Sequence, residues 1–200
     1  TERLINYLPM SVSKLTNIAT KYDINEDILS LGVTRACKLR GVYIAESTET
    51  VDNVIPNITL SGNVQFKKGE IIEGVSSGAK GRVIHVNSSK VYFVYESEIQ
   101  FIPNEGVKSF KTQLTGTVST ISNGVENVGS KFKLNDGQNL HTFEFSSIEK
   151  LNSGLLIEST KQVYVVYDYF ADVTPGTGTY TTVNSFYNSN LDNIPSYEVD

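Results

Sequence analysis

Phe66-Lys-Lys-Gly-Glu70, followed by Gly81-Arg-Val83, recurs 35 residues further along the chain as Phe101-Ile-Pro-Asn-Glu105, followed by Gly116-Thr-Val118. In each copy the pattern predicts a strand, a turn that carries a glutamate, a second strand, and a turn of small residues before a third strand. Internal repetition indicates architecture before any single residue does. We therefore expect a duplicated β-unit in which the aromatic residue fills the interior and the glutamate stabilises a turn. Gly81 and Gly116 are expected where backbones approach closely.

Short candidate strands surround this repeat. They cover residues 58–61, 63–66, 70–73, 81–87, 90–95, 99–102, 107–110 and 115–121, and Gly, Ser, Asn and Pro separate them. Strands this short and this closely spaced are typical of a compact barrel or sandwich. The sequence thus predicts a mainly β fold with a small β-barrel-like module, internally duplicated, over residues 51–126.

The N-terminal fifty residues have a different period. Leu15, Ile18 and Ala19 recur at helical spacing after Ser11 or Ser13, either of which is a suitable N-cap, so residues 10–31 are predicted to form one helix or two short ones. From Val33 to Ile44 the period changes to two, which predicts a strand. We expect residues 1–50 to be an N-terminal docking segment of helix and strand, and 45–57 to be a connecting loop.

Residues 127–200 are expected to form a second antiparallel β-module with an extended C-terminal arm. Residues 131–134 and 140–145 alternate around Asn135-Asp-Gly137, which is a strong hairpin signal. Residues 162–170 predict a strand with Val163, Val165, Tyr167 and Tyr169 on one face and Tyr164, Val166, Asp168 and Phe170 on the other. Since both faces are largely apolar, this strand should be central in a sheet or lie at an assembly interface.

Composition excludes several classes of function. The net charge is −5 and the basic residues are scattered, so the clustered basic face that nucleic-acid binding needs is missing. The single cysteine, Cys37, rules out an intrachain disulfide framework and a site with several thiolates, and is expected to be a buried structural thiol. No apolar run is long enough to predict membrane insertion, and no secretory signal is visible. We expect the chain to be a section of a longer polypeptide.

Candidate chemical motifs are weak. The stretch from Gly74 to Gly81 superficially resembles a phosphate-binding loop but lacks its spacing and leads into a strand. His85 and His141 stand on predicted strands without a carboxylate cluster. Glu70 with Glu73, or Asp168 with Asp172, would be acid pairs only if the fold set their separation. Asn135-Asp-Gly-Gln138 lacks the spacing of an EF-hand calcium loop. We assign no catalytic, cofactor-binding or metal residues and predict that the chain is not an enzyme.

Four segments of the last third carry a resemblance. Leu134-Asn-Asp-Gly-Gln138, Val163-Tyr-Val-Val-Tyr-Asp-Tyr-Phe170, Tyr180-Thr-Thr-Val-Asn-Ser-Phe-Tyr187 and Asp192-Asn-Ile-Pro-Ser-Tyr197 occur in that order. Together with Gly69-Glu-Ile-Ile-Glu-Gly-Val-Ser-Ser-Gly-Ala-Lys-Gly-Arg-Val83, they resemble β-modules of large virion structural proteins from contractile-tailed phages, especially cyanophages and related marine phages. The likeness covers residues 33–197. The chain departs from it at Asn139-Leu-His-Thr-Phe143 and at Phe186, and residues 1–50 have no counterpart.

The resemblance implies a structural component of the virion tail, assembled in the host cytoplasm, in the baseplate or fibre-attachment region. It implies other virion proteins as partners, a homo-oligomer, and contact with a host surface glycan as a further option. We hypothesise an interface made by seven aromatic residues: Tyr164, Tyr167, Tyr169, Phe170, Phe186, Tyr187 and Tyr197. The alternatives are a carbohydrate-binding adhesin or receptor-binding β-domain, which the absence of Trp weakens, and a tail-borne polysaccharide-degrading enzyme.

Overall fold

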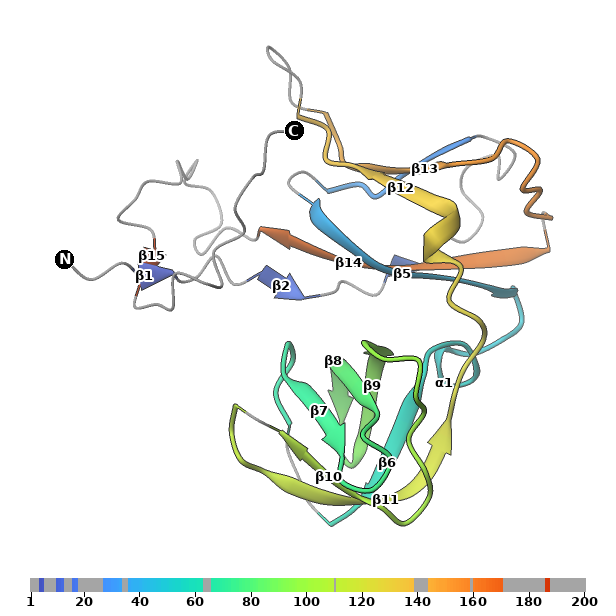
Figure 1. Cartoon of the computed structure of the whole chain (residues 1–200). Coiled ribbons are helices and arrows are strands. Elements are labelled where there is room, and N and C mark those ends of the chain that lie inside the picture. The colour runs from blue at the N-terminus through green and yellow to red at the C-terminus, as the bar shows by residue number, and fades with distance from the viewer. Residues whose placement is uncertain are drawn as a thin grey trace.

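The computed structural model describes residues 4–5, 10–12, 16–17, 27–33, 36–62, 66–109, 111–138, 144–158, 160–170 and 186–187. The fold is mainly β, with antiparallel strand pairs throughout these residues (Figure 1). Its elements in chain order are β1 (Leu4–Ile5), β2 (Met10–Val12), β3 (Thr16–Asn17), β4 (Ile28–Ser30), β5 (Ala36–Glu46), α1 (Val51–Val54), β6 (Asn57–Ser61), β7 (Ile71–Gly74), β8 (Lys80–Asn87), β9 (Lys90–Tyr95), β10 (Gly106–Ser109), β11 (Thr115–Ser122), a 3-10 turn (Gly129–Lys131), β12 (Phe132–Asn135), β13 (Ser147–Lys150), β14 (Lys161–Phe170) and β15 (Phe186–Tyr187).

Six strands close into a barrel in the order β10-β11-β6-β9-β8-β7, which runs from turquoise at β6 through green to yellow at β11 in Figure 1. Apolar residues at every second position of these strands fill its interior, as expected for a closed antiparallel barrel. Phe66 and Phe101, the repeated aromatics, are each 3% exposed inside it, as predicted. Residues 99–102 were predicted to be a strand, but they lie in the loop between β9 and β10, where Phe101 packs edge-on against Phe93.

Equivalent hydrogen bonds, 35 residues apart, occur in the two hairpins β7–β8 and β10–β11. Val83 N–H donates to Glu70 O at 2.9 Å, and Val118 N–H donates to Glu105 O at 2.9 Å. Strands β7 and β10 pair with each other, and Glu73 stands opposite Lys108 at the centre of that pairing. The two residues of this central pair, Glu73 and Lys108, are themselves 35 positions apart in the chain.

The second part of the fold consists of two sheets packed against each other. One has β14 at its centre, with β5 along one edge and β2 and β3 along the other. The second has the order β12-β13-β4. The cluster between them contains Leu29, Val42, Ile148, Val163, Val165 and Tyr167, among others. The predicted strand 162–170 is therefore confirmed and central, and the apolar side chains from Val163 to Tyr169 divide between its two faces as predicted.

Three expectations about elements were wrong. Within 10–31 the described residues form strands β2, β3 and β4, because their backbones pair with β14 and β13. In the hairpin predicted over 131–145, β12 pairs with β13, Glu144 and Phe145 belong to no strand, and residues 140–143 lie outside the described residues. The loop expected over 45–57 includes the last residues of β5 and the short helix α1.

The expected division into segments 1–50, 51–126 and 127–200 also differs from the observed arrangement. Strands β4 and β5 of the first segment share sheets with β13 and β14 of the last. The barrel is thus inserted between β5 and β12 of a single two-sheet unit. A third cluster joins the barrel to this unit, and its buried members are Tyr43, Ala45, Val54, Ile55, Ile84, Tyr92, Val94, Tyr164 and Val166.

Candidate functional site

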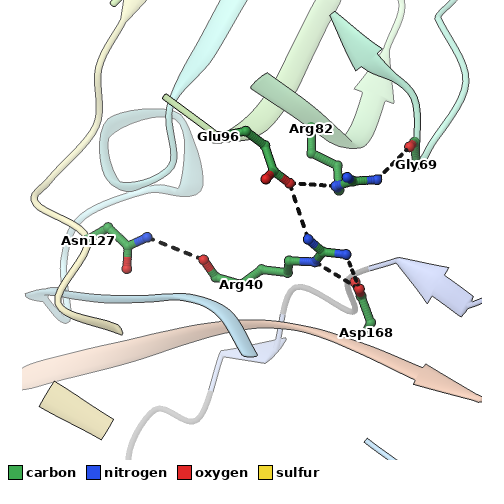
Figure 2. Close-up of polar contacts among 6 residues, drawn as sticks. All are labelled: Arg40, Gly69, Arg82, Glu96, Asn127 and Asp168. Carbon is green, nitrogen blue, oxygen red and sulfur yellow. Dashed lines mark hydrogen bonds and ion pairs between the residues drawn. The ribbon is translucent and has the colours of Figure 1, made fainter. Parts of the chain in front are cut away.

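A β-bulge at Arg40 directs its side chain toward the barrel. Gly41 pairs with Val166 and Leu39 pairs with Tyr167, so Arg40 is left without a residue opposite it on β14. The extra residue reverses the alternation of β5, and Leu39 therefore packs on the core between the sheets. Bulges commonly re-aim one side chain in this way. Here the bulge places a guanidinium where the sheet meets the barrel (Figure 2).

The Arg40 guanidinium joins carboxylates from both parts of the fold. Its Nε donates to Asp168 Oδ2 of β14 at 2.8 Å, and its Nη2 donates to the same oxygen. Its Nη1 donates to Glu96 Oε1, just after β9, at 3.2 Å. Arg82 of β8 donates through Nε to the same Glu96 oxygen at 2.6 Å, and through Nη1 to Gly69 O at 3.2 Å. Figure 2 shows the four charged side chains as one chain of contacts from sheet to barrel.

Burial makes the Arg40–Asp168 pair the central contact of this network. The side chain of Asp168 is 0% exposed and that of Arg40 is 8% exposed, whereas those of Arg82 and Glu96 are 21% and 30% exposed. Asp168 Oδ1 is buried and has no hydrogen-bond partner among the described residues. A buried carboxylate is stable only when a partner compensates its lost hydration, and Arg40 supplies this compensation.

The Asn127 side chain holds the bulge in place. Its Oδ1 accepts from Val42 N–H at 3.0 Å and from Gly129 N–H at 2.9 Å, and its Nδ2 donates to Arg40 O at 3.3 Å. A side chain on Gly41 would place its Cβ 3.0 Å from Asn127 Nδ2, a tight contact that Asn127 would have to relieve by moving. Beside this contact lies a hollow of about 420 Å³, lined by Leu39, Arg40, Asn127, Gly129, Ser130 and Phe132.

Cys37 lies at a second register shift of β5, between Ala36 and Lys38, and its Sγ donates to Asp168 O at 3.5 Å. The thiol was expected to be buried, but it is half-buried. Burial and the negative charge of Asp168 raise its pKa to about 11, although Arg40 partly offsets this. The thiolate is the nucleophilic form, so this environment disfavours it at neutral pH.

The repeated glutamates form a second set of polar contacts, inside the barrel, and each stabilises a turn of the other hairpin. Glu105, 4% exposed, accepts at Oε2 from the N–H groups of Ser76 and Ser77 at 3.2 and 3.0 Å, and at Oε1 from Ile102 N–H at 2.7 Å. The Ser77 hydroxyl also contacts both oxygens at 2.9 Å. Glu70, 3% exposed, accepts at Oε2 from the Thr112 hydroxyl at 3.2 Å.

Glu105 accepts from more donors than Glu70 does, and these donors lower the pKa of its carboxyl. Burial raises the pKa, but the N–H groups of Ile102 and Ser77, the Ser77 hydroxyl and Ser76 N–H outweigh it, so the pKa lies below its ordinary value. Glu70 Oε1, by contrast, is buried without a hydrogen-bond partner among the described residues. The two glutamates occupy equivalent positions but differ in how completely they are hydrogen-bonded.

These contacts explain why residues 74–81 resembled a phosphate loop. Backbone N–H groups in this turn do bind an anion, and that anion is the chain's own Glu105 carboxylate. Gly81 was expected to lie close to a backbone segment, but its nearest neighbour is the Phe93 side chain. A Cβ there would lie 2.6 Å from the ring carbon Cδ2 of Phe93, so the close approach is to a side chain rather than to backbone.

The remaining candidate residues have structural surroundings. Glu73 lies 3.9 Å from Lys80 Nζ and 3.6 Å from Lys108 Nζ on the outside of the barrel. Exposed His85 lies beside the Tyr92 ring, with 5.6 Å between ring centroids. Asn135 Oδ1 accepts from Gly137 N–H at 3.0 Å within its own turn. His141 and Asp172 lie outside the described residues. In the part of the chain that the structure describes, no three His, Cys, Asp or Glu side chains gather as metal ligands would.

The seven residues of the hypothesised aromatic interface are placed differently. Tyr164 and Tyr167 are 7% and 0% exposed and pack within the chain's own clusters, so no neighbouring subunit is needed to cover them. Tyr169 is half-buried beside Tyr167, with 5.8 Å between ring centroids. Phe170, Phe186 and Tyr187 lie in strands whose backbone alone is described, and Tyr197 lies outside the described residues.

Sequence reasoning missed the network of Arg40, Arg82, Glu96 and Asp168. The one available signal was Asp168 itself, a single carboxylate in an otherwise apolar and aromatic strand, which must be paired if that strand is central. The partner, Arg40, could not be predicted because only a bulge turns its side chain toward the Asp168 face of the sheet. This bulge depends on pairing between segments more than 120 residues apart.

Comparison with known protein families, with curated proteins and with solved structures gives no match for this chain. Across the described ranges, none of the helices has the length and apolar character that spanning a bilayer requires. The class of protein must therefore be argued from the arrangement itself, in which a closed barrel and a two-sheet unit share one apolar cluster and one charge network.

Proposed function

We propose that the chain is a structural component of a phage virion, in the tail baseplate or the fibre-attachment region, and that it acts by protein–protein assembly without catalysis. The observation that carries the proposal is the double attachment of barrel to sheets, through the shared cluster around Tyr43 and through the Arg40 network. Such attachment suits a part that transmits force or fixes the orientation of its neighbours. The resemblance to virion β-modules over residues 33–197 supports the same role.

Duplication of a β-unit within the barrel is part of this proposal. The equivalent hydrogen bonds at Val83 and Val118 support it, as do the paired roles of Glu70 and Glu105. Tandem repetition of one supersecondary unit is a common way to build extended assemblies. In this view the N-terminal segment and the C-terminal arm connect the chain to other virion proteins and to further copies of itself.

Immunogold electron microscopy of tailed particles that encode this chain tests the proposal, with antibody raised against the folded 200-residue chain. We expect label at the baseplate or at the fibre roots, and preimmune serum on the same particles is the control. If neither intact nor detergent-disrupted particles are labelled, the virion assignment is wrong.

A glycan array with the purified chain distinguishes the assembly proposal from the alternative of a carbohydrate-binding adhesin. Sugar-binding sites usually present exposed aromatic rings. Each tyrosine whose side chain is described is buried or half-buried, and Phe145 is the one exposed ring among the described tyrosines and phenylalanines. We therefore expect no glycan binding by the purified chain. Specific binding in the array, together with unlabelled particles, would replace the assembly proposal with the adhesin.

A further inference from the structure

Two turns of the barrel have the same backbone but different side chains. The first turn covers residues 74–79, between β7 and β8, and the second covers residues 109–114, between β10 and β11, with residue 110 outside the described residues. In each turn an N–H donates to the carbonyl four residues before it, from Gly78 at 2.9 Å and from Gln113 at 3.0 Å. These two residues also share a positive φ, of 72° and 57°. The turns are therefore equivalent in backbone, and their side chains decide how firmly each is held.

The first turn is closed over a carboxylate for which a glycine leaves room. Glu105 Oε2 accepts from the N–H groups of Ser76 and Ser77 at 3.2 and 3.0 Å. A Cβ on Gly74 would lie 2.5 Å from this oxygen and would displace the carboxylate. Hydrogen bonds to an ionised acceptor are roughly twice as strong as those between neutral groups. The first turn is therefore held in place by charge-assisted bonds.

The second turn begins with a serine where the first begins with a glycine. Ser109 is 1% exposed, and its Oγ accepts from the N–H groups of Lys111 and Thr112 at 3.3 and 3.4 Å. These two N–H groups are the equivalents of those that bind Glu105 in the first turn. Glu70, the equivalent of Glu105, accepts from the Thr112 hydroxyl at 3.2 Å, and its Oε1 is buried without a hydrogen-bond partner among the described residues. In the second turn, long bonds to a neutral hydroxyl thus replace the bonds to a carboxylate.

Two further properties of the second turn favour its opening. Gln113 adopts its positive φ with a side chain, whereas Gly78 adopts the same conformation without steric cost. Opening of the second turn would also expose the unpaired oxygen of Glu70 to water, which removes the penalty of burying it. Opening of the first turn has no such gain, because its carboxylate would lose the donors that it already has.

We infer that residues 109–114 form a segment of the barrel that opens on its own, and that Ser109 keeps it able to open by excluding Glu70 from the N–H groups of the turn. The equivalent turn over 74–79 stays closed. Segments that move when a protein binds a partner are drawn from such regions of low local stability. The opening is a property of the chain itself and does not depend on the proposed virion role.

Amide hydrogen exchange of the whole chain, followed by NMR, tests the difference between the turns. The N–H groups of Gly78 and Gln113 make equivalent backbone hydrogen bonds, so they are matched reporters. We expect the protection factor of Gly78 to be at least about tenfold higher than that of Gln113, because the second turn opens more often. Equal protection, or higher protection at Gln113, would overturn the inference.

Ser109→Gly tests the cause of this difference. Without the serine Cβ and hydroxyl, Glu70 can accept from the N–H groups of the turn, so the protection factor of Gln113 should rise about tenfold. Glycine by itself loosens a backbone, so a rise requires the new contact with the carboxylate. Unchanged or lower protection of Gln113 in this variant would show that Ser109 does not keep the turn weak.

Gly74→Ser is the matched reverse substitution. Its Cβ displaces Glu105 from the first turn, so the protection factor of Gly78 should fall about tenfold. The protection factor of Gln113 should change by less than about twofold, since the second turn keeps its own contacts. Protection of Gly78 that survives the substitution would mean that the carboxylate does not hold the first turn closed. If this variant fails to fold, the wild-type comparison and Ser109→Gly still decide the question.

Discussion

At the scale of single residues, two positions depend on their immediate neighbours: Glu105, which stabilises a turn, and Gly81, which lies against the core. The Glu105 carboxylate accepts hydrogen bonds from backbone N–H groups of a turn 28 residues away, at Ser77. Gly81 leaves space for the Phe93 ring. Both effects come from tight local geometry, so conservative substitutions should be costly there. The same substitutions at nearby positions that lack such neighbours should change stability little.

Glu105→Gln should lower the free energy of unfolding at pH 7 by about 2–3 kcal/mol, because a charged acceptor is replaced by a neutral amide among buried N–H donors. Urea denaturation followed by circular dichroism measures this. Glu98→Gln, at an exposed position of the same loop, is the matched control and should change stability by less than about 0.5 kcal/mol. Equal effects of the two substitutions would show that the turn does not depend on the carboxylate.

The cost of Glu105→Gln should also depend on pH. The donors around Glu105 hold its folded-state pKa below the unfolded value of about 4.3, so the folded state binds fewer protons between the two values. The stabilisation is fully present above the unfolded-state pKa and is lost as pH falls through the folded-state pKa. The stability difference between wild type and variant should therefore be constant from pH 7 to about pH 5 and should shrink as the pH falls further toward 2. A difference that stays constant over the whole range would contradict the assignment.

Gly81→Ala should destabilise the barrel by about 1–3 kcal/mol, since the new Cβ would lie 2.6 Å from Cδ2 of the buried Phe93 ring and the ring would have to shift. Thermal unfolding measures the effect. Gly106→Ala is the control, because its Cβ would meet Val75 Cγ2 at 3.4 Å, an ordinary contact in another barrel strand. A larger loss at Gly106 than at Gly81 would refute the packing argument.

At the scale of elements, bulges in two strands build the contact between barrel and sheet. In β5 the bulge turns Arg40 toward Glu96. In β8 the register shift between Val83 and His85 leaves Ile84 without an opposite residue, and Ile84 packs in the shared cluster. One strand thus contributes a charge to the junction and the other an apolar side chain.

Arg40→Met should lower the free energy of unfolding by about 3–5 kcal/mol, because it leaves the fully buried Asp168 carboxylate without a counter-charge. Arg82→Met removes a guanidinium from the more exposed part of the network and should cost about 1 kcal/mol or less. The double variant Arg40→Met/Asp168→Leu should recover much of the loss, since no buried charge remains. Failure of the second substitution to recover stability would mean that Arg40 acts mainly through packing.

At the scale of the whole molecule, the barrel and the two-sheet unit should unfold as one cooperative unit. They share an apolar cluster, and the barrel is inserted between β5 and β12 of the same two-sheet unit. A fluctuation that opens the barrel therefore exposes apolar surface of the sheets as well.

Amide hydrogen exchange shows whether the barrel and the two-sheet unit unfold together or separately. Ile72→Ala lies inside the barrel core, and Ile84→Ala lies in the cluster shared with the sheets. Each should cost about 2–4 kcal/mol, and each should reduce protection of the β14 amides by the same amount as that of the β9 amides. If Ile72→Ala reduces protection in the barrel but not in β14, the two parts unfold separately.

The sequence alone determined the features that depend on local pattern. Alternation predicted β14 and the division of its faces, the repeat predicted the buried Phe66 and Phe101, and the paired glutamates predicted turn stabilisation. These features arise within a few residues of chain, where periodicity and turn chemistry are decisive.

Only the tertiary structure decided which segments pair. The backbone of Met10–Val12 became a strand because β14 had an edge to cover, and β12 paired with β13 because Ile148 fits the core. Arg40 contacts Asp168 because of a bulge, and each glutamate contacts a turn of the other hairpin. Such choices depend on contacts between residues far apart in the chain, and their free energy outweighs the weak local preferences that a sequence pattern records.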